Sequence, residues 1–572
     1  MWRTHSIQRA SALLVATMGL VSIISTLLAH GLFRDPELQE LARAVLPMMI
    51  ENASRSLALM SGFGLLMLAR GLWRGKQVAW TLTLVLLACS AILHLLKGFD
   101  WEEAIGAAML GGALLSQRRQ FVRCSDPPTL RRAPVFFAAG CAAIAVYGLA
   151  GFWLLRAFQP FSPTSAIYEI AAQMIWTDGA YAGLVRGHAA WFLNSIGVLS
   201  ATLFGTTLLL LLRPVLPHRP RAADRQAADA LLTVYATSSL APFARDDDKQ
   251  LYFGESVEGV VAYRVANNVA VVCGDPIAAP VHVGALAREF QRFCRRQDWQ
   301  VCFYEVQPRH LSDYAPLGFT AVKIGEDAWI DLPKFTLNGS KISDIRHAVS
   351  KVERDRIIFR QLASECDTAI WAQMQAIEAG WRASQGGVDL RFSIGRLPAH
   401  PDPRARYTVA LAADGLTVLA YCSFLPIEGI GGRALDVMRR AKGCPNGTME
   451  FLIAHSLELF RDTGDSWCSL GLAPLADIDA PRNSLIERGI RMVYANPTIN
   501  ATYHYQSLFF FKHKFNPEWR GGYLLYPNAL ALPQVLAAIV RVHAPSVGPR
   551  LLVDAARDRM LAPLFRPITA KG

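Results

Sequence analysis

Apolar residues are concentrated in the first part of the chain and are dispersed in the rest. Six apolar stretches stand out near the N-terminus, at about 10–32, 54–73, 78–97, 101–117, 135–157 and 191–213. A helix of about 20 residues crosses the ~30 Å hydrocarbon core of a bilayer. The pattern therefore predicts a multi-pass α-helical membrane bundle of about six helices over residues 1–213, in which 101–117 is the shortest stretch.

Basic residues between these stretches indicate the topology. They gather before the first stretch and in every second loop after it, at Arg3, Arg9, Arg70, Arg74, Lys76, Arg118, Arg119, Arg123, Arg131, Arg132, Arg213, Arg219, Arg221 and Arg225. The intervening loops hold acidic residues instead, at Asp35, Glu37, Glu40, Asp100 and Glu169. Loops rich in lysine and arginine stay on the cytosolic side of a membrane. We therefore expect the N-terminus and everything beyond residue 213 to be cytosolic.

Two roles are open to such a bundle. It is either a path along which lipid moves or is flipped, or an anchor for the part that follows. Charged residues inside the spans, which usually mark a transport path, are almost absent here. The composition of the spans therefore favours the anchor.

Beyond a basic, proline-rich linker at 214–227, the pattern becomes that of a soluble protein. Short strand-like runs alternate with helix-like runs, which predicts a cytosolic α/β (α+β) sheet protein. We expect two subdomains, at 228–365 and 366–540, followed by a tail at 541–572. The ten cysteines of the chain include no CxxC pair, which argues against a zinc ribbon or a redox motif.

Two polar segments are candidates for chemistry. The first runs from Lys341 to Arg360 and is dense in basic residues, among them Arg346, His347, Lys351 and Arg354. Such a segment is either a solvated helix face or a surface that holds phosphates. The second segment places Asp436, Arg439 and Arg440 in an apolar strand context, which indicates either a site or a surface salt bridge.

Several blocks, taken together and in order, resemble a known family. They are Lys323–Ala328, Leu337–Arg354, Asp436–Glu450, Ser469–Leu475, Phe511–Trp519 and Tyr523–Pro527. The blocks resemble the C-terminal synthase domain of the aminoacyl-phosphatidylglycerol synthases, the multiple peptide resistance factor proteins. The resemblance runs from about residue 228 to residue 535.

The resemblance implies a tandem GNAT-like fold in a bacterial inner membrane protein. It implies transfer of an aminoacyl group, lysyl, alanyl or similar, from aminoacyl-tRNA to a hydroxyl of phosphatidylglycerol, with neither metal nor coenzyme A. The best candidate for a pyrophosphate cradle, Arg382–Gly387, has Gln385 where the first glycine is required. Two alternatives stay open: a lipid transporter with a regulatory soluble domain, and the same transferase fold acting on another lipid or on a peptide.

The resemblance also assigns candidate residues. Asp436 and Arg439 are expected in the active site, where Asp436 positions the amino group or the lipid hydroxyl and Arg439 binds phosphate or an ester oxygen. Lys512 is expected to be the family's catalytic lysine. It is preferred over Lys514, which lies two residues on and so cannot share its helical face.

The remaining candidate residues are expected to bind substrate or tRNA. Substrate-binding candidates are Arg440, Glu450, Lys514 and His347, and candidate contacts to tRNA phosphates are Lys341, Arg346, Lys351 and Arg354. A homo-oligomer through the membrane helices is compatible with the sequence. The long family members have many more spans than this chain, which counts against a second, lipid-flipping activity.

Overall fold

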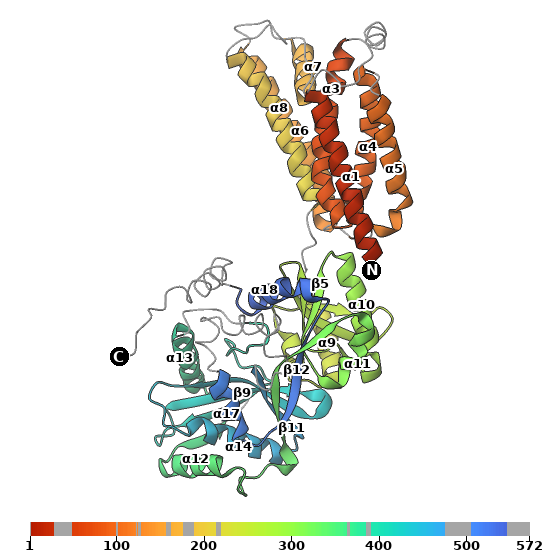
Figure 1. The fold of residues 1–572 in the computed structure, drawn as a ribbon. Coiled ribbons are helices and arrows are strands. Elements are labelled where there is room, and N and C mark those ends of the chain that lie inside the picture. The colour runs from red at the N-terminus through yellow and green to blue at the C-terminus, as the bar shows by residue number, and fades with distance from the viewer. Residues whose placement is uncertain are drawn as a thin grey trace, which may run out of the picture. The chain divides into compact units, whose positions relative to one another are not determined.

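The computed structural model describes residues 2–27, 48–98, 101–121, 123, 127–155, 162–175, 188–212, 219–362, 367–384, 391–474 and 505–545. These residues form two compact units (Figure 1). One is a bundle of N-terminal helices, and the other is built on a single mixed β-sheet. Each unit has its own hydrophobic core.

The N-terminal unit is helical at every predicted apolar stretch. Its helices are α1 (Trp2–Leu27), α3 (Met48–Trp73), α4 (Gln77–Gly98), α5 (Trp101–Ser116), α6 (Pro127–Leu155), α7 (Pro163–Met174) and α8 (His188–Leu211). Close helix contact is possible because small residues meet. A Cβ added to Gly19 of α1 would lie 2.8 Å from the carbonyl oxygen of Gly62 on α3.

Four of these helices are long and apolar enough to cross a membrane, at Ile7–Ile24, Gln77–His94, Ala133–Leu154 and Trp191–Leu211. This confirms a membrane protein. The predicted count of about six is met only in part. The apolar section of α3 is the shorter Leu57–Trp73, and α5 has only 16 residues.

The second unit holds twelve strands within its described residues, in the order β1-β2-β3-β5-β12-β6-β11-β10-β9-β8-β7, with β4 paired to β2. The strands are β1 (Gln250–Phe253), β2 (Gly259–Ala266), β3 (Val269–Cys273), β4 (Ile277–Ala278), β5 (Gln300–Val306), β6 (Thr320–Asp331), β7 (Ile358–Gln361), β8 (Arg406–Leu411), β9 (Val418–Ile427), β10 (Gly432–Arg440), β11 (Trp467–Pro474) and β12 (Glu518–Tyr526). The principal helices are α9 (Ala222–Tyr235), α10 (Val283–Arg296), α11 (Leu311–Tyr314), α12 (Ser343–Arg354), α13 (Thr368–Ser384), α14 (Thr448–Asp462), α17 (Tyr505–His513) and α18 (Leu532–His543).

One arrangement occurs twice in this sheet. Strands β2 and β3 form an antiparallel pair, α10 crosses over, and β5 returns parallel to β3. Strands β9 and β10 likewise form an antiparallel pair, α14 crosses over, and β11 returns parallel to β10. A parallel return needs such a crossover. The expected tandem architecture is therefore confirmed.

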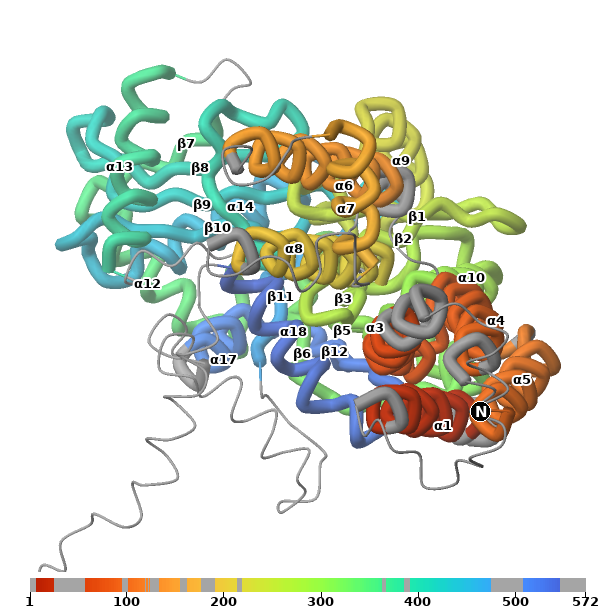
Figure 2. Tube along the Cα trace, turned by 90° about the horizontal axis from the view of Figure 1, so that it is seen from above, coloured from red at the N-terminus to blue at the C-terminus, as the bar shows by residue number. Residues whose placement is uncertain are grey.

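The two halves exchange strands, which the predicted boundaries did not foresee. Strand β12 follows β11 in the chain but lies between β5 and β6, and β6 pairs with β11 (Figure 2). Because of this exchange, the predicted division at 365/366 does not separate two sheets.

The outer predicted boundaries also shift. Helix α9 begins inside the predicted linker, where the backbone N–H of Arg221 donates to Asp224 Oδ2 at 2.8 Å and caps the first turn. Helix α18 ends at His543, three residues into the predicted tail.

Different helices cover the two faces of strands β8 to β10. On one face, Trp371 and Met374 of α13 pack on Tyr421 and Val437. On the other, residues of α12 and α14 pack on Cys422 and Phe424. Since side chains alternate across a strand, neighbouring residues of β9 and β10 belong to different faces. Figure 1 shows α13 on the opposite side of the sheet from α12 and α14.

Candidate active site

Asp436 occupies a β-bulge in strand β10. Leu435 pairs with Phe424 and Val437 pairs with Ser423, so Asp436 is the extra residue between two consecutive pairs. A bulge re-aims a side chain that would otherwise follow the strand alternation. The bulge brings Asp436 to the face covered by α13.

One oxygen of the Asp436 carboxylate accepts a hydrogen bond, and the other accepts none from the described residues. Oδ2 accepts a hydrogen bond from Ser423 Oγ at 2.9 Å, and the same hydroxyl oxygen accepts from Val437 N at 3.1 Å. Oδ1 is buried and has no hydrogen-bond partner among the described residues. A Cβ added to Gly395 would lie only 1.6 Å from Oδ1. Because Gly395 has no side chain, the space beside Oδ1 remains open.

The environment of Asp436 favours its protonated form. Burial raises the pKa of this carboxyl to about 7, with smaller contributions from the negative charges of Asp246 and Glu378. The hydrogen bond from Ser423 and the positive charge of Arg439 act in the opposite direction. A carboxyl poised near neutral pH suits a general base.

Arg439 lies on the same face and is held on several sides. Its Nε is 3.2 Å from Glu378 Oε2, though the N–H does not point at that oxygen. Its guanidinium stacks on the Trp381 ring at 3.5 Å, and Nη1 donates to the carbonyl of Met438. Tyr421 donates to Glu378 Oε2 at 2.9 Å. The structure thus places Asp436 and Arg439 on the same face of the sheet, where the positive charge of Arg439 acts on the Asp436 carboxyl.

The first half of the sheet also contributes to this cluster. Lys249, just before β1, is buried and donates to Asp248 Oδ1 at 2.6 Å and to the Phe392 carbonyl at 2.8 Å. Phe392 belongs to the same described segment as Gly395, and the next residue, Ser393, bonds to His543 Nε2 at 2.8 Å. The segment that contains Gly395 is therefore held by Lys249 and His543, which are both distant from it in the sequence.

A second polar cluster lies where β11 bulges between Ser469 and Leu472. Lys512 of α17 is buried and donates to the carbonyls of Gly471 at 2.8 Å and Leu472 at 2.9 Å. Burial lowers the pKa of this ammonium to about 8, although Asp327 and Glu305 favour its charge. The predicted catalytic lysine thus holds the bulge of β11 in place.

Asp327 of β6 is the centre of this second cluster. It accepts hydrogen bonds from Ser469 Oγ at 2.6 Å, from Ser239 Oγ at 2.6 Å and from the Trp329 indole at 2.8 Å. Its charge is therefore fully hydrogen-bonded, which is the condition for burying a carboxylate.

Glu305, at the end of β5, belongs to the same cluster and is less well satisfied. It is 8% exposed, and its backbone φ of 64° is in the left-handed region. No hydrogen bond or ion pair reaches its carboxylate from the part of the chain that the structure describes. Burial, with the charge of Asp327, raises its pKa well above the usual range. Strain of this kind is concentrated at functional sites.

The other predicted residues lie away from Asp436. Lys514 forms an ion pair with Glu450 at 3.0 Å, so two predicted substrate-binding residues bind each other. Arg440 ends β10 and is exposed. The predicted tRNA contacts and His347 lie in or beside α12, which packs on the face opposite Asp436. Lys341, His347, Lys351 and Arg354 are exposed, whereas Arg346 donates to the carbonyls of Leu337 and Gly339.

Several residues of the two clusters have no signal in the sequence. Ser423, Glu378, Trp381 and Lys249 become neighbours of the site only through the fold. Asp327 lies within the block Lys323–Ala328 that resembles the synthase family, and that block was the only available pointer. Among the described residues, no group of three or more His, Cys, Asp or Glu side chains is placed to hold a metal ion.

Comparison with known proteins identifies the family. The profile described as "Phosphatidylglycerol lysyltransferase, C-terminal" matches residues 229–526, which is just over half of the chain. The chain belongs to this family. A phosphatidylglycerol lysyltransferase of Bacillus subtilis is 24% identical over 495 residues, which cover 85% of this chain and 54% of that protein. The lysylphosphatidylglycerol biosynthesis bifunctional protein LysX of Mycolicibacterium gilvum is 27% identical, covering 84% of this chain and 44% of that one. The chain thus spans about half the length of these relatives.

Solved structures from the family share the fold of the sheet unit. One is a C-terminal domain assigned to a lysylphosphatidylglycerol synthetase of Agrobacterium fabrum. It is 26% identical with a TM-score of 0.51, and the match covers 57% of this chain and 98% of that domain. L-PGS of Bacillus licheniformis superposes with a TM-score of 0.50 at 22% identity, with the same coverage. These matches agree with the sheet architecture described above.

Proposed function

We propose that this chain transfers an aminoacyl group from aminoacyl-tRNA to a hydroxyl of phosphatidylglycerol, with Asp436 as the general base. The observation that supports this most directly is the half-buried Asp436 at the β10 bulge, whose buried Oδ1 has no partner among the described residues. Its pKa of about 7 lets it take up a proton at neutral pH. Membership of the phosphatidylglycerol lysyltransferase family supplies the reaction class.

The proposed step is a transesterification. The lipid hydroxyl oxygen attacks the ester carbonyl carbon and forms the new C–O bond, while its proton passes to Asp436 Oδ1. The C–O bond to the terminal ribose of the tRNA then breaks, and the ribose oxygen leaves with that proton. The aminoacyl ester is already activated, so the step needs neither ATP nor a metal, and no coenzyme A takes part.

Arg439 acts in this scheme as a positioning residue. It is stacked on Trp381 and paired with Glu378, so its charge is fixed beside the carboxyl. A fixed positive charge keeps the pKa of Asp436 from rising further, which leaves part of the population ionised at neutral pH. We also infer that the sheet unit is cytosolic, because the arginine-rich loops flank the predicted spans on that side.

The exposed basic face of α12 is the proposed tRNA contact. Lys341, Lys351 and Arg354 are all exposed on this helix or just before it, where they are open to phosphate groups. Contacts of this kind weaken steeply as salt concentration rises.

Lipid extracts test the proposal. Cells of a bacterium without aminoacylated lipids, expressing this chain, are expected to contain a new aminoacyl-phosphatidylglycerol, detected by mass spectrometry. Asp436→Asn removes the base and is expected to lower its amount by about 100-fold or more. Asp462→Asn is the matched control, since Asp462 is 63% exposed at the end of α14, away from the cluster.

The same measurement can overturn the proposal. If the protein is well expressed in the membrane and no aminoacyl lipid forms, the transferase assignment is wrong. If Asp436→Asn makes as much product as Asp462→Asn, the assignment of the base is wrong. Supplying the purified chain with separately charged tRNAs identifies the amino acid.

A further inference from the structure

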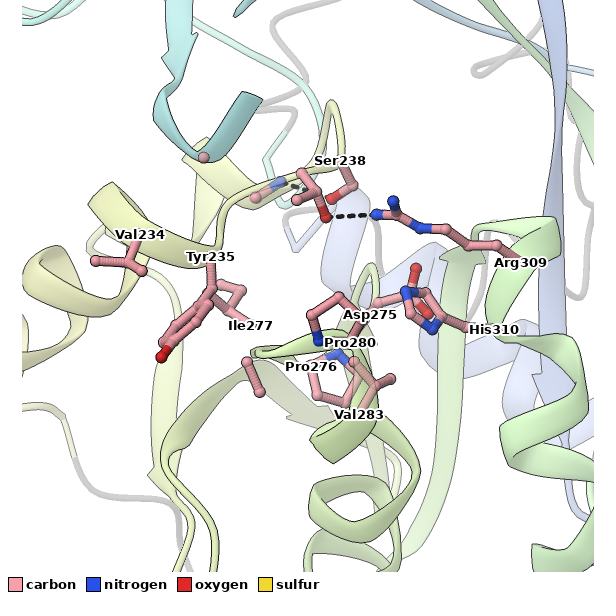
Figure 3. Close-up of a pocket in the computed structure, with 14 residues that line it drawn as sticks. Val234, Tyr235, Ser238, Asp275, Pro276, Ile277, Pro280, Val283, Arg309 and His310 are labelled. Carbon is pink, nitrogen blue, oxygen red and sulfur yellow. Dashed lines mark hydrogen bonds between the residues drawn. The ribbon is translucent and has the colours of Figure 1, made fainter. Parts of the chain in front are cut away.

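The sheet unit holds a pocket of about 210 Å³ that is lined mainly by its first half, and the residues that line it include none of the Asp436 cluster. The lining comes from the end of α9 with the residues after it, the turn after β3 with β4, the start of α10 with the 3-10 helix before it, and the 3-10 helix η4 (Pro308–His310). Gly429, which follows β9, also lines the pocket. Figure 3 shows Val234 and Tyr235 on one side of the pocket, and Arg309 and His310 on the other.

Two cationic or hydrogen-bonding side chains are held in place at this pocket. Arg309 Nη2 donates to Thr237 Oγ1 at 2.5 Å, which uses one of the five N–H groups of the guanidinium. His310 is 6% exposed, and its Nδ1 lies 3.1 Å from Asp313 Oδ2. That bond orients the ring and leaves Nε2, which has no hydrogen-bond partner within the described residues. Arg309 matches the oxygens of a phosphodiester. His310 donates through Nδ1 to Asp313, so its Nε2 is an acceptor that matches a ligand hydroxyl.

A fixed carboxylate lies beside them. Asp275 Oδ2 accepts from the backbone N–H of Gln307 at 3.0 Å, and Oδ1 accepts from the Tyr314 hydroxyl at 3.0 Å. Each carboxylate oxygen keeps a second lone pair for another donor. A bare phosphate would be repelled by this carboxylate. A ligand that carries both a phosphodiester and hydroxyl groups would use Arg309 for the phosphodiester, and His310 Nε2 and the carboxylate for the hydroxyl groups.

The rim of the pocket is apolar. Val234, which lines it, is 59% exposed, and Val281, next to the lining residue Pro280, is 84% exposed. Ile277 and Val283 continue the apolar lining inward. Polar groups inside with apolar side chains at the mouth match a lipid headgroup near its glycerol backbone. A nucleic acid would instead favour an extended basic surface.

The pocket adjoins the second polar cluster. Ser238 lines the pocket, and the next residue, Ser239, donates to Asp327. In the same way, η4 follows Glu305 at the end of β5 by three residues. Two chain segments are therefore shared between the pocket and the cluster that contains Lys512.

We propose that this pocket binds the glycerophosphoglycerol headgroup of an anionic phospholipid. Arg309 holds the phosphodiester, His310 Nε2 and Asp275 accept from the glycerol hydroxyls, and the apolar rim contacts the start of the acyl chains. The choice of this lipid rests on the proposed function, whereas the match to a hydroxyl-bearing phosphodiester rests on the pocket alone.

Direct binding tests the pocket without relying on transfer. The full chain in detergent is titrated with glycerophosphoglycerol, the water-soluble deacylated headgroup, and binding is followed by saturation-transfer NMR. Arg309→Gln is expected to weaken binding by about tenfold, the effect of losing one charge-assisted hydrogen bond. Arg288→Gln, which removes an exposed arginine on α10 outside the pocket, is expected to bind as the unaltered chain does.

A second arm separates the lipid from a free glycerol phosphate. Phosphatidylglycerol vesicles are expected to displace the probe, and phosphatidylcholine vesicles are not. If neither displaces it, the ligand is a soluble glycerol phosphate and the lipid assignment is overturned. If uncharged tRNA displaces the probe and phosphatidylglycerol does not, the pocket binds nucleic acid instead.

The outcomes also separate this proposal from the proposed function. Equal binding by Arg309→Gln and Arg288→Gln overturns the pocket assignment, whatever the transfer activity. Probe binding that depends on Arg309 supports the pocket even if no aminoacyl lipid forms. Asp436→Asn is expected to bind the probe normally and to lose transfer.

Discussion

The two halves of the sheet have the same connectivity but differ where their parallel strands end. In the first half, β3 and β5 stay in register over five pairs, from Val269–Gln300 to Cys273–Tyr304, and the N–H of Gly274 then bonds to the Tyr304 carbonyl. In the second half, β10 and β11 share three pairs, ending at Ala434–Ser469. Both strands bulge immediately afterwards.

This difference shows how one architecture acquires the open strand ends around Asp436 in one copy only. Backbone groups of a paired strand are satisfied by the neighbouring strand, which leaves no room for a ligand. At the two bulges, side chains form the hydrogen bonds with these backbone groups instead of a neighbouring strand. Ser423 Oγ accepts from Val437 N, Ser469 Oγ accepts from Gly471 N, and Lys512 binds two carbonyls of β11. Asp436 lies at the point where the strands stop pairing.

The largest effect is expected from a change at Gly395, beside the bulge in the second half of the sheet. In Gly395→Ala, the added methyl group would lie within bonding distance of Asp436 Oδ1, so one of the two must move. Transfer is expected to fall by about 100-fold, because a displacement of about 1 Å from the reacting geometry has effects of this size. Initial rates with phosphatidylglycerol vesicles and charged tRNA measure it.

Gly380→Ala is the control for that change. Gly380 lies in α13, and among the described residues no atom outside its own helical turn lies within 4 Å of an added Cβ. Alanine there is expected to raise the free energy of unfolding by about 1 kcal/mol and leave the rate unchanged. Equal rates for both alanine variants would show that the space beside Oδ1 is not used.

The second test concerns the bulge of β11. Lys512→Met leaves the half-buried carbonyls of Gly471 and Leu472 without their buried donor, and the free energy of unfolding is expected to fall by about 2 kcal/mol. Lys514→Met breaks only the half-exposed ion pair with Glu450 and is expected to cost less than about 1 kcal/mol. Denaturant titration of the two variants measures the difference. Equal losses would contradict a structural role for Lys512.

A smaller effect compares the halves directly. Amide hydrogens of β3 and β5 are held by an unbroken ladder, whereas those just beyond the bulges depend on single side-chain bonds. Exchange of the amides of Val437 and Gly471 is expected to be about tenfold faster than that of Gly274, the equivalent of about 1 kcal/mol. Hydrogen–deuterium exchange with peptide resolution measures this, and uniform protection would contradict the difference between the halves.

Some of these features could be predicted from the sequence, and others could not. Long apolar stretches predict the membrane helices because length and composition act locally. Asp436 and Arg439 stand out because charge is rare in a strand with an apolar context. The bulge that re-aims Asp436 depends on the register between β9 and β10, and neither strand alone encodes it.

Contacts between distant segments were beyond prediction for the same reason. Glu378, Gly395 and Lys249 reach the site from three separate elements, and each has an ordinary local context. The exchange of β6 and β12 between the halves is likewise a property of the assembled sheet. The basic residues of α12 stand out in the sequence because of their charge density, but the sequence does not say on which face of the sheet they lie, and the fold places them opposite Asp436.

The central claim, that Asp436 is the base, is tested most directly by the pH dependence of the transfer rate. A base must be ionised, so the single-turnover rate is expected to rise tenfold per pH unit below about 7 and to level off above it. Ser423→Ala removes a hydrogen bond that stabilises the ionised carboxyl, so the inflection is expected to move to higher pH. An inflection that stays at the same pH in Ser423→Ala, or a rate independent of pH between 5 and 8, would contradict the account.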